Sequence, residues 1–239
     1  MTTPRSYLLC GTPRTGSTLL CSLLSSTGVL GRPESYFREA DEAAWAARFD
    51  LATDGSRVRD YTAFVQAVRA AATTANGVFA ARIMWGSLER MMLGLQPQGR
   101  SELAALEHAF GPLLFVQLLR DDIVGQAVSW HRAEQTGFWQ PGDAAVRPSE
   151  PNVDRMKQLV DTIRDHNAAW QSWFDRHGIR PHPVTYEQLV HDPRRAVENI
   201  ATRLGVRPAA DWQPCSPHRK QADEINVAWS AALHAALDA

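Results

Sequence analysis

The chain has 239 residues, 44% hydrophobic and 21% charged, a composition typical of one large globular domain and not of a disordered chain. Its formal net charge is −1, so no global field would attract nucleic acid, and any anion site must be local. The three cysteines, Cys10, Cys21 and Cys215, form no C-x-x-C pair, which argues against a zinc ribbon and a disulfide scaffold. Apolar runs are too short for a membrane span and no signal-peptide pattern is present, so a cytoplasmic location is expected.

Short apolar runs alternate with helical patterns along the whole chain. The first run, Tyr7 to Cys10, ends at Gly11 and is followed by a helical pattern from Ser17 to Thr27, which predicts a strand, a turn and a helix. The nearly continuous apolar run from Leu113 to Leu119 predicts a strand buried on both faces. Further strands are expected at 78–84 and 182–186, and helices at 39–51, 61–75, 101–109, 122–135, 153–177, 193–204 and 226–237.

This alternation predicts one α/β domain over residues 1–239. We expect a three-layer, P-loop-like arrangement in which a central parallel sheet of four or five strands is flanked by helices on both faces. Residues 28–37 and 137–151 are rich in glycine or proline and are expected to be loops.

The segment Gly11 to Thr18 has the spacing of a P-loop and lies between a predicted strand and a predicted helix. Such a loop turns backbone N–H groups and a helix N-terminus toward an anion. Ser17 stands where a nucleotide triphosphatase has lysine, while Arg14 within the loop can reach the same anion with two parallel donors. A glycine-rich turn without a ligand is the alternative interpretation.

A second set of polar residues follows the strongest strand. Arg120 should emerge at the carboxyl end of the sheet, beside the anion loop, and Asp121 or Asp122 should cap the next helix. Ser129 lies two turns beyond Asp122 on the same helix face, so Arg120 and Ser129 could bind a second anionic group. Alternatively, the aspartate pair could bind magnesium in a P-loop kinase.

A short cationic run from Pro217 to Asp223 precedes the last predicted helix and contains one of the two lysines of the chain, Lys220. It could close over a nucleotide phosphate, or it could be an ordinary solvated surface segment.

Three of these motifs together resemble the 3′-phosphoadenosine 5′-phosphosulfate (PAPS)-dependent sulfotransferases. The segment Pro13 to Leu20 is similar to their 5′-phosphosulfate loop, and Arg120 with Ser129 is similar to their 3′-phosphate motif. The segments 31–37, 126–130 and 219–223 narrow the resemblance to the bacterial trehalose 2-sulfotransferase-like family, over nearly the whole chain and in the same order.

The resemblance implies transfer of a sulfuryl group from PAPS, as co-substrate, to a hydroxyl of a carbohydrate or another small polar alcohol, without a metal. It also suggests a homodimer and gives no indication of nucleic-acid binding or a membrane span. Arg14 and Glu34 would be catalytic. The resemblance assigns donor binding to Arg14, Thr15, Gly16, Ser17, Thr18, Arg120, Ser129, Arg219, Lys220 and Gln221, and acceptor binding to Glu34, Tyr36, Trp85 and Trp139.

The acceptor hydroxyl needs a base, because its own pKa lies far above neutral. The family supplies an acidic residue from the segment after the first helix, where Glu34 is the obvious carboxylate. In the trehalose enzyme the glutamate corresponds to Ser35, one residue later than Glu34. The competing candidates are Glu39, Asp41, His131, His166 and His218.

Most of the eight tryptophans are expected to pack in the core, as Trp170 and Trp173 should on the long helix. Trp85 and Trp139 follow elements that lead toward the expected site and are the candidates for stacking against a sugar ring. A metal-dependent kinase and a non-catalytic nucleotide-binding module remain the alternative functions.

Overall fold

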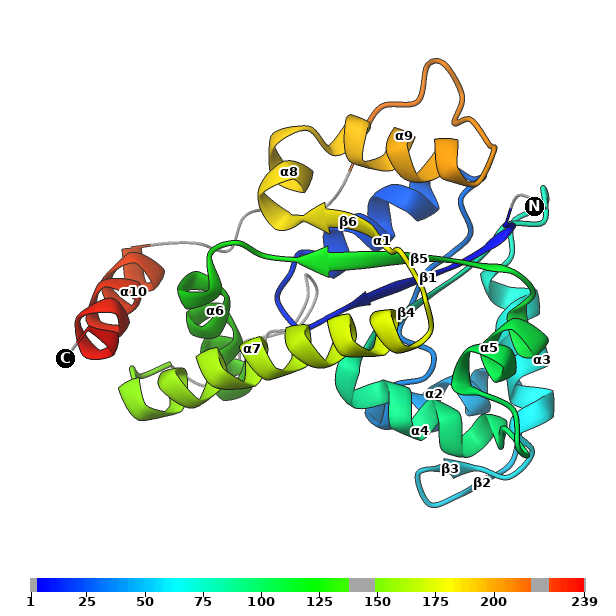
Figure 1. Cartoon of the computed structure of the whole chain (residues 1–239), viewed down its shortest axis with the longest axis horizontal. Coiled ribbons are helices and arrows are strands. Elements are labelled where there is room, and N and C mark those ends of the chain that lie inside the picture. The colour runs from blue at the N-terminus through cyan, green and yellow to red at the C-terminus, as the bar shows by residue number, and fades with distance from the viewer. Residues whose placement is uncertain (1–3, 138–148, 216–223, 239) are drawn as a thin grey trace.

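A parallel four-stranded sheet forms the centre of the computed structural model, which describes residues 4–137, 149–215 and 224–238. The strand order is β4-β1-β5-β6 (Figure 1). Strand β1 lies between two neighbours, since Leu8 is in register with Ala81 of β4 and Phe115 of β5. These strands are β1 (Ser6–Gly11), β4 (Phe79–Met84), β5 (Leu113–Leu119) and β6 (His182–Thr185).

Helices cover both faces of the sheet, which confirms the predicted three-layer α/β fold. Figure 1 shows α8 and α9 on one side of the sheet and α7 on the other. The first face packs against α1 (Ser17–Ser26), α8 (Tyr186–His191) and α9 (Pro193–Arg203). The second packs against α3 (Tyr61–Ala72), α4 (Trp85–Leu95), α5 (Glu102–Phe110) and α7 (Val153–Arg176).

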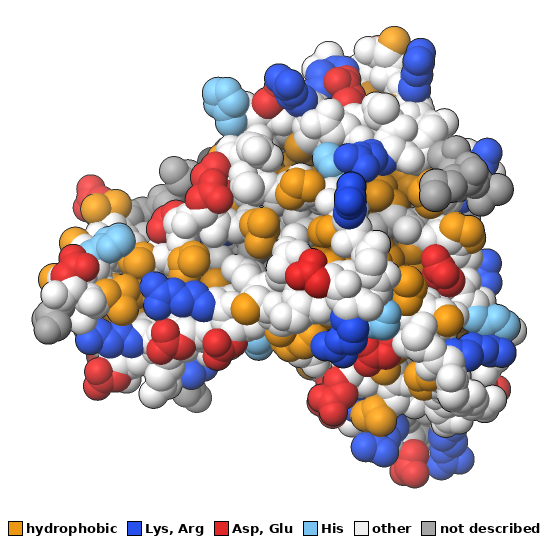
Figure 2. All heavy atoms as spheres, in the orientation of Figure 1, with side chains coloured by type: hydrophobic (Ala, Val, Ile, Leu, Met, Phe, Trp, Pro, Cys, Tyr) orange, Lys and Arg blue, Asp and Glu red, His pale blue; other side chains and the backbone are white. Residues whose placement is uncertain are grey.

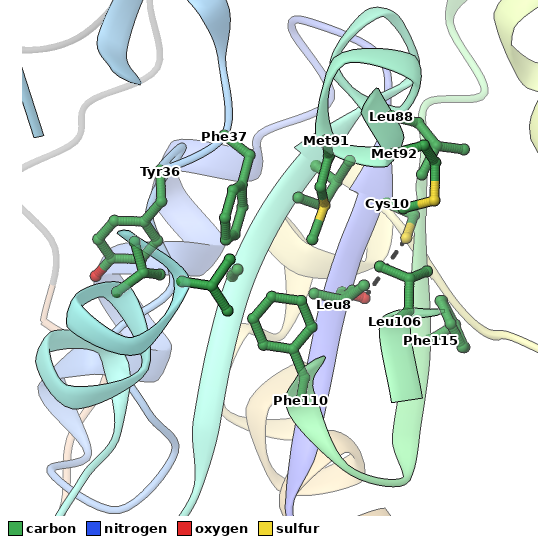
Figure 3. Close-up of a cluster of buried hydrophobic side chains, with 14 of the residues drawn as sticks. Leu8, Cys10, Tyr36, Phe37, Leu88, Met91, Met92, Leu106, Phe110 and Phe115 are labelled. Carbon is green, nitrogen blue, oxygen red and sulfur yellow. Dashed lines mark hydrogen bonds between the residues drawn. The ribbon is translucent and has the colours of Figure 1, made fainter. Parts of the chain in front are cut away.

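The strand side chains alternate between two hydrophobic clusters, as in a sheet buried on both faces. Leu8 and Cys10 of β1 enter the cluster that contains Phe37, Phe110 and Phe115 (Figure 3). Tyr7 and Leu9 enter the opposite cluster, with the leucines of α1. Trp170 and Trp173 are 1% exposed in the first cluster, which confirms their predicted packing role.

A third cluster lies beyond the carboxyl ends of the strands. It joins α6 (Ile123–Thr136) and the first half of α7 to α10 (Glu224–Leu237), mainly through Val128, Leu159 and Trp229 (Figure 1). Asp122 caps α6 by accepting a hydrogen bond from the Gly125 N–H at 2.7 Å, as the sequence predicts. The third cluster therefore holds α6 beside the sheet edge where the site is expected.

The sequence patterns missed three elements: α4, α8, and the hairpin of β2 (Thr53–Asp54) and β3 (Arg57–Val58). Helix α4 follows β4 without an intervening turn and without a side-chain cap, so no start signal marks it. Helix α8 has only six residues, too few to show a hydrophobic period, and Tyr186, predicted as a strand residue, begins it. Helix α2 (Glu39–Arg48) lies where the sequence predicts a helix.

Charges of both signs are interspersed on the face shown in Figure 2. This pattern agrees with the near-zero net charge and with a local rather than a global anion site. Within the described ranges, no helix is long and apolar enough to cross a membrane.

Candidate functional site

The loop between β1 and α1 has the backbone conformation of an anion-binding turn. Gly16 has φ 74° immediately before α1, where a side chain would lie 2.7 Å from the Tyr186 ring. Arg14 has φ 69°, a conformation that residues other than glycine seldom adopt and that is frequent at functional sites. The N-terminus of α1 carries no side-chain cap, so its first N–H groups face the loop without an internal acceptor.

Helix α6 holds this loop in place through Gln126. The buried Gln126 amide donates hydrogen bonds from Nε2 to Thr12 Oγ1 and to the Pro13 carbonyl oxygen, both at 2.8 Å. The Thr15 hydroxyl donates to the Thr12 carbonyl oxygen at 3.0 Å. The sequence alone assigns Gln126 no role other than its place in the family motif at 126–130, because its partners are more than a hundred residues away.

Arg14 connects the two predicted anion sites. Its Nε donates a hydrogen bond to Ser129 Oγ at 2.9 Å, which joins the loop to the helix of the second motif. Burial, with repulsion from Arg120 as a smaller cause, lowers the pKa of Arg14 to about 10. The guanidinium is therefore still charged at neutral pH, and two cations near each other favour an anion between them.

Arg120 is held from three directions at the end of β5. Its guanidinium lies 4.7 Å over the Tyr186 ring, and Nη2 donates to Asp122 Oδ2 at 3.2 Å. Nη1 makes a long contact of 3.5 Å to the Arg14 carbonyl oxygen. The structure thus brings Arg14, Arg120 and Ser129 together, as the sequence predicts for residues that share one ligand.

The Asp122 carboxylate has a structural role. Both oxygens of Asp122 are engaged, one by the Gly125 N–H and the other by Arg120. The N–H groups of Asp121 and Asp122 donate to the Glu187 carboxylate at 3.2 and 3.4 Å. In the part of the chain that the structure describes, no group of three or more His, Cys, Asp or Glu side chains could hold a metal ion.

A hollow of about 610 Å³ opens between this loop and helix α2. It joins residues of the donor motif to the segment that carries the candidate base. Its lining residues are Pro13, Arg14, Ser17, Thr18, Glu34, Ser35, Arg38, Asp41, Ala44, Trp45, Arg48, Arg82, Met84 and Gly137.

Arg82 of β4 is the site residue that the sequence analysis missed. Its Nη1 donates to Ser17 Oγ at 3.2 Å and to Thr18 Oγ1 at 3.0 Å, while its Nε donates to Ser35 Oγ at 2.9 Å. One guanidinium therefore links the anion loop to the segment that carries Glu34. A charged side chain within an otherwise apolar strand was the available signal.

The Glu34 carboxylate lies in the hollow and keeps part of its surface exposed. Partial desolvation raises its pKa above the ordinary value, and Asp41 adds to the rise, while Arg82 and Arg48 oppose it. The Glu34 carbonyl oxygen accepts the Arg82 N–H at 3.0 Å, which fixes the backbone beside β4. Among the described residues, no hydrogen bond to the Glu34 carboxylate is formed, so it is available to a ligand.

Ser35 and Glu34 place their side chains differently. Ser35 is buried and accepts the Arg82 Nε–H, whereas Glu34 is exposed in the hollow. Successive residues of an extended segment face opposite ways, so only one of the two can present its full side chain to a ligand. Of the pair, Glu34 has the carboxylate and the open position.

Of the competing base candidates that the structure describes, Asp41 lines the hollow, whereas Glu39, His131 and His166 are not among its lining residues. Asp41 lines the hollow but pairs with Arg38 through two contacts of 2.6 and 2.7 Å, and Glu39 pairs with Arg90 at 2.9 Å. The buried His131 ring contacts the Glu150 carbonyl oxygen at 3.2 Å, and His166 lies beside Trp130. His218 lies outside the described residues.

The aromatic candidates for the acceptor site are placed as follows. Tyr36 is 2% exposed and donates its hydroxyl to the Arg32 carbonyl oxygen at 2.8 Å. Trp85 packs edge-on against Trp170 at 5.1 Å between ring centroids. Trp45 of α2, which the sequence analysis did not single out, lines the hollow. Trp139, Arg219, Lys220 and Gln221 lie outside the described residues, so their predicted roles stay predictions.

Comparison with known proteins gives a family match over nearly the whole chain. The model of the Stf0 sulphotransferase family matches residues 6–235. The chain is 27% identical to a trehalose 2-sulfotransferase of Mycobacterium tuberculosis (strain ATCC 35801 / TMC 107 / Erdman), covering 94% of this chain and 92% of that protein. It is 26% identical to a trehalose 2-sulfotransferase of Mycolicibacterium smegmatis (strain ATCC 700084 / mc(2)155), covering 95% and 93% of the two chains.

Among solved structures, the sulfotransferase domain from the curacin biosynthetic pathway is 15% identical and superposes with a TM-score of 0.52. The match covers 94% of this chain and 81% of that domain, and it supports the fold. The extent of the family match, from β1 to α10, includes every described element of the site. The chain belongs to the Stf0 sulphotransferase family and is a sulfotransferase.

Proposed function

We propose that this sulfotransferase takes its sulfuryl group from PAPS and transfers it to a hydroxyl of a carbohydrate. A trehalose-like sugar is the first acceptor to test. The supporting observation is that Glu34 lines the same hollow as Arg14, Ser17 and Thr18. A base and an anion loop that share one cavity are what direct transfer between two bound substrates requires. The trehalose-named relatives support the sugar as acceptor.

The donor has two anionic ends, and two neighbouring groups of residues could bind them. The 5′-phosphosulfate would bind the N–H groups of the loop, the N-terminus of α1 and the Ser17 and Thr18 hydroxyls. The 3′-phosphate would bind at Arg120 and Ser129. Arg14, whose side chain reaches Ser129 from within the loop, would interact with both ends of the nucleotide.

In the transfer step the acceptor oxygen bonds to sulfur as the bond from sulfur to the bridging phosphate oxygen breaks. Negative charge grows on that bridging oxygen, where Arg14 and the loop N–H groups would stabilise it. Arg82, bonded to Ser17 and Thr18, adds a further positive charge beside the loop. The products are the sulfated sugar and adenosine 3′,5′-bisphosphate.

The proton of the acceptor hydroxyl would pass to the Glu34 carboxylate. Partial desolvation raises the pKa of Glu34, which improves its strength as a base. Arg82 orders the backbone of this segment through the Glu34 carbonyl oxygen and the Ser35 hydroxyl. The base would thus be positioned by the same residue that contacts the donor loop, through its main-chain N–H and its Nε.

The test is a transfer assay with PAPS and a panel of sugars that includes trehalose and glucose, in the presence of a metal chelator. We expect equal amounts of sulfated sugar and adenosine 3′,5′-bisphosphate, detected by mass spectrometry. Phosphorylation of the panel from ATP and magnesium would instead support the kinase. Nucleotide binding without transfer to any hydroxyl would support a non-catalytic module.

A further inference from the structure

One face of helix α2 forms a wall of the hollow. Asp41, Ala44, Trp45 and Arg48 lie within two turns of the helix and line the hollow together, and Arg38 lies just before the helix. The donor-loop residues line the hollow from a different element, so the α2 face is available to the acceptor. The chemistry of this face should therefore limit which acceptors fit.

Four arginines line the hollow, and three of them form side-chain hydrogen bonds with neighbouring residues. Arg14 bonds to Ser129 and Arg82 bonds to the serine and threonine hydroxyls described above. Arg38 forms a two-contact pair with Asp41. In the described ranges, no carboxylate lies within ion-pair distance of the fourth, Arg48.

The Arg48 guanidinium is held by an aromatic ring instead. Its central carbon lies 4.6 Å from the Trp45 centroid, while Phe49 stacks with that ring at 5.9 Å and Tyr36 contacts it at 4.7 Å. A sugar ring could stack on Trp45 only by displacing one of these groups. The wall formed by α2 therefore presents the Arg48 guanidinium in a fixed position. It does not offer an open aromatic face to a sugar ring.

A guanidinium fork recognises carboxylates and phosphates with two parallel hydrogen bonds. A neutral sugar would leave the Arg48 guanidinium without a counter-ion. The charge of Arg48 does reach Glu34, where it opposes the rise of the Glu34 pKa. An acceptor with its own anionic group would complete the pairing while a hydroxyl on the same molecule approached Glu34.

We propose that the physiological acceptor is an anionic carbohydrate, one that carries a carboxylate or a phosphate, and that Arg48 binds this group. The proposal rests on the proposed function, because it assigns an acceptor class to the same hollow. Arg48 would be a specificity-determining residue that acts on acceptor binding. It has no part in the donor site.

The test compares glucose, glucuronic acid and glucose 6-phosphate as acceptors, with PAPS as donor. We expect kcat/KM for at least one anionic sugar to exceed that for glucose by about tenfold to a hundredfold, the worth of a charged hydrogen-bonded pair. Arg48→Gln should lower kcat/KM for the anionic sugar to that for glucose measured with the same variant, whereas Arg48→Lys should keep part of the preference. Arg69→Gln, at an exposed position on α3 away from the hollow, removes the same charge and should change nothing.

Glucuronic acid and glucose 6-phosphate distinguish a carboxylate from a phosphate as the bound anion. Equal use of glucose and both anionic sugars, or a preference that survives Arg48→Gln, would overturn the proposal. Calorimetry of sugar binding to protein loaded with adenosine 3′,5′-bisphosphate distinguishes failure of this proposal from failure of the proposed function. If no sugar is sulfated, the proposed function fails, yet tighter binding of an anionic sugar than of glucose, lost in Arg48→Gln, would still support the anion site. Equal binding of all three sugars would refute it.

Discussion

Arg82 and Glu34 show how single side chains connect the donor and acceptor ends of the hollow. Arg82 bonds to the loop hydroxyls and to Ser35, and its N–H holds the Glu34 carbonyl oxygen. Its guanidinium can donate in several directions from one rigid plane, which lysine cannot do. Substitutions of these two side chains therefore test directly the roles of charge and of hydrogen-bond geometry in the hollow.

The first prediction concerns the base. Glu34→Gln should lower kcat by about 10² to 10⁴ and leave the affinity for adenosine 3′,5′-bisphosphate unchanged, since the amide keeps the shape but cannot accept the proton. Steady-state rates and nucleotide titration measure the two effects. Glu89→Gln, an exposed position on α4, is the matched control. A variant that transfers at the wild-type rate would move the search for the base to Asp41.

The second prediction concerns stability and pH. The hollow raises the pKa of Glu34 above its value in the unfolded chain, so ionisation of this group destabilises the fold. That destabilisation is absent below the ordinary glutamate pKa, about 4.3, and is complete once the pH exceeds the raised pKa. Glu34→Gln should therefore raise Tm at pH 7 but not at about pH 4. A lower Tm for this variant at pH 7 would contradict the assigned direction.

The third prediction concerns Arg82. Arg82→Lys keeps the charge but cannot bond to Ser35 and the loop hydroxyls together, so kcat should fall by about tenfold to a hundredfold, as expected for the loss of a charged hydrogen bond. Comparing kcat with the dissociation constant of adenosine 3′,5′-bisphosphate separates positioning of Glu34 from donor binding. Unchanged kcat would show that the fork geometry is dispensable.

Helix α6 contacts the donor loop, and in the proposed binding mode this contact would link the two ends of the nucleotide. Gln126 supports the loop, while Ser129, one turn later on α6, accepts the Arg14 hydrogen bond. Asp122 caps the same helix and orients Arg120. A small displacement of α6 would therefore disturb both anion sites at once.

The fourth prediction tests this linkage. Gln126→Leu removes one buried and one partly buried hydrogen bond to the loop and should cost about 1 to 3 kcal/mol in the free energy of unfolding. It should also weaken binding of both adenosine 3′,5′-bisphosphate and adenosine 5′-phosphosulfate, because the 5′ loop binds both. Gln66→Leu, exposed on α3, is the control. If only the nucleotide with the 3′-phosphate were affected, α6 would act through Ser129 alone.

Local sequence signals such as caps, glycine turns and continuous apolar runs were sufficient for several elements, although α8 was missed in spite of its capping box of Thr185 and Gln188. Strands β1 and β5 and helix α6 follow such signals and lie where the patterns predict. The motifs also predicted the proximity of Arg14, Arg120 and Ser129, because the carboxyl ends of parallel strands meet at one edge. Arg82 could not be assigned in this way, since its partners lie 47 to 65 residues away and only packing brings them together.

In the whole molecule, each of the three hydrophobic clusters holds an element that carries residues of the candidate site. One carries the sheet and the segment with Phe37, the second carries α1 and the third carries α6. A ligand that spans the loop and α6 should therefore stabilise the entire fold.

The fifth prediction is that adenosine 3′,5′-bisphosphate raises Tm in the presence of a metal chelator, whereas ATP with magnesium raises it little. At a hundredfold excess over the dissociation constant the expected stabilisation is about 2.7 kcal/mol. Differential scanning fluorimetry measures both shifts. Stronger protection by ATP and magnesium would favour a kinase site over a sulfotransferase site.

The central claim is that the donor loop and Glu34 act on one bound pair of substrates. A crystal structure with adenosine 3′,5′-bisphosphate and trehalose or glucuronic acid tests it most directly. We expect the 5′-phosphate at Arg14 and the loop N–H groups, the 3′-phosphate at Arg120 and Ser129, and a sugar hydroxyl within hydrogen-bond distance of the Glu34 carboxylate. A sugar bound outside the hollow, or a 5′-phosphate away from Arg14, would contradict it.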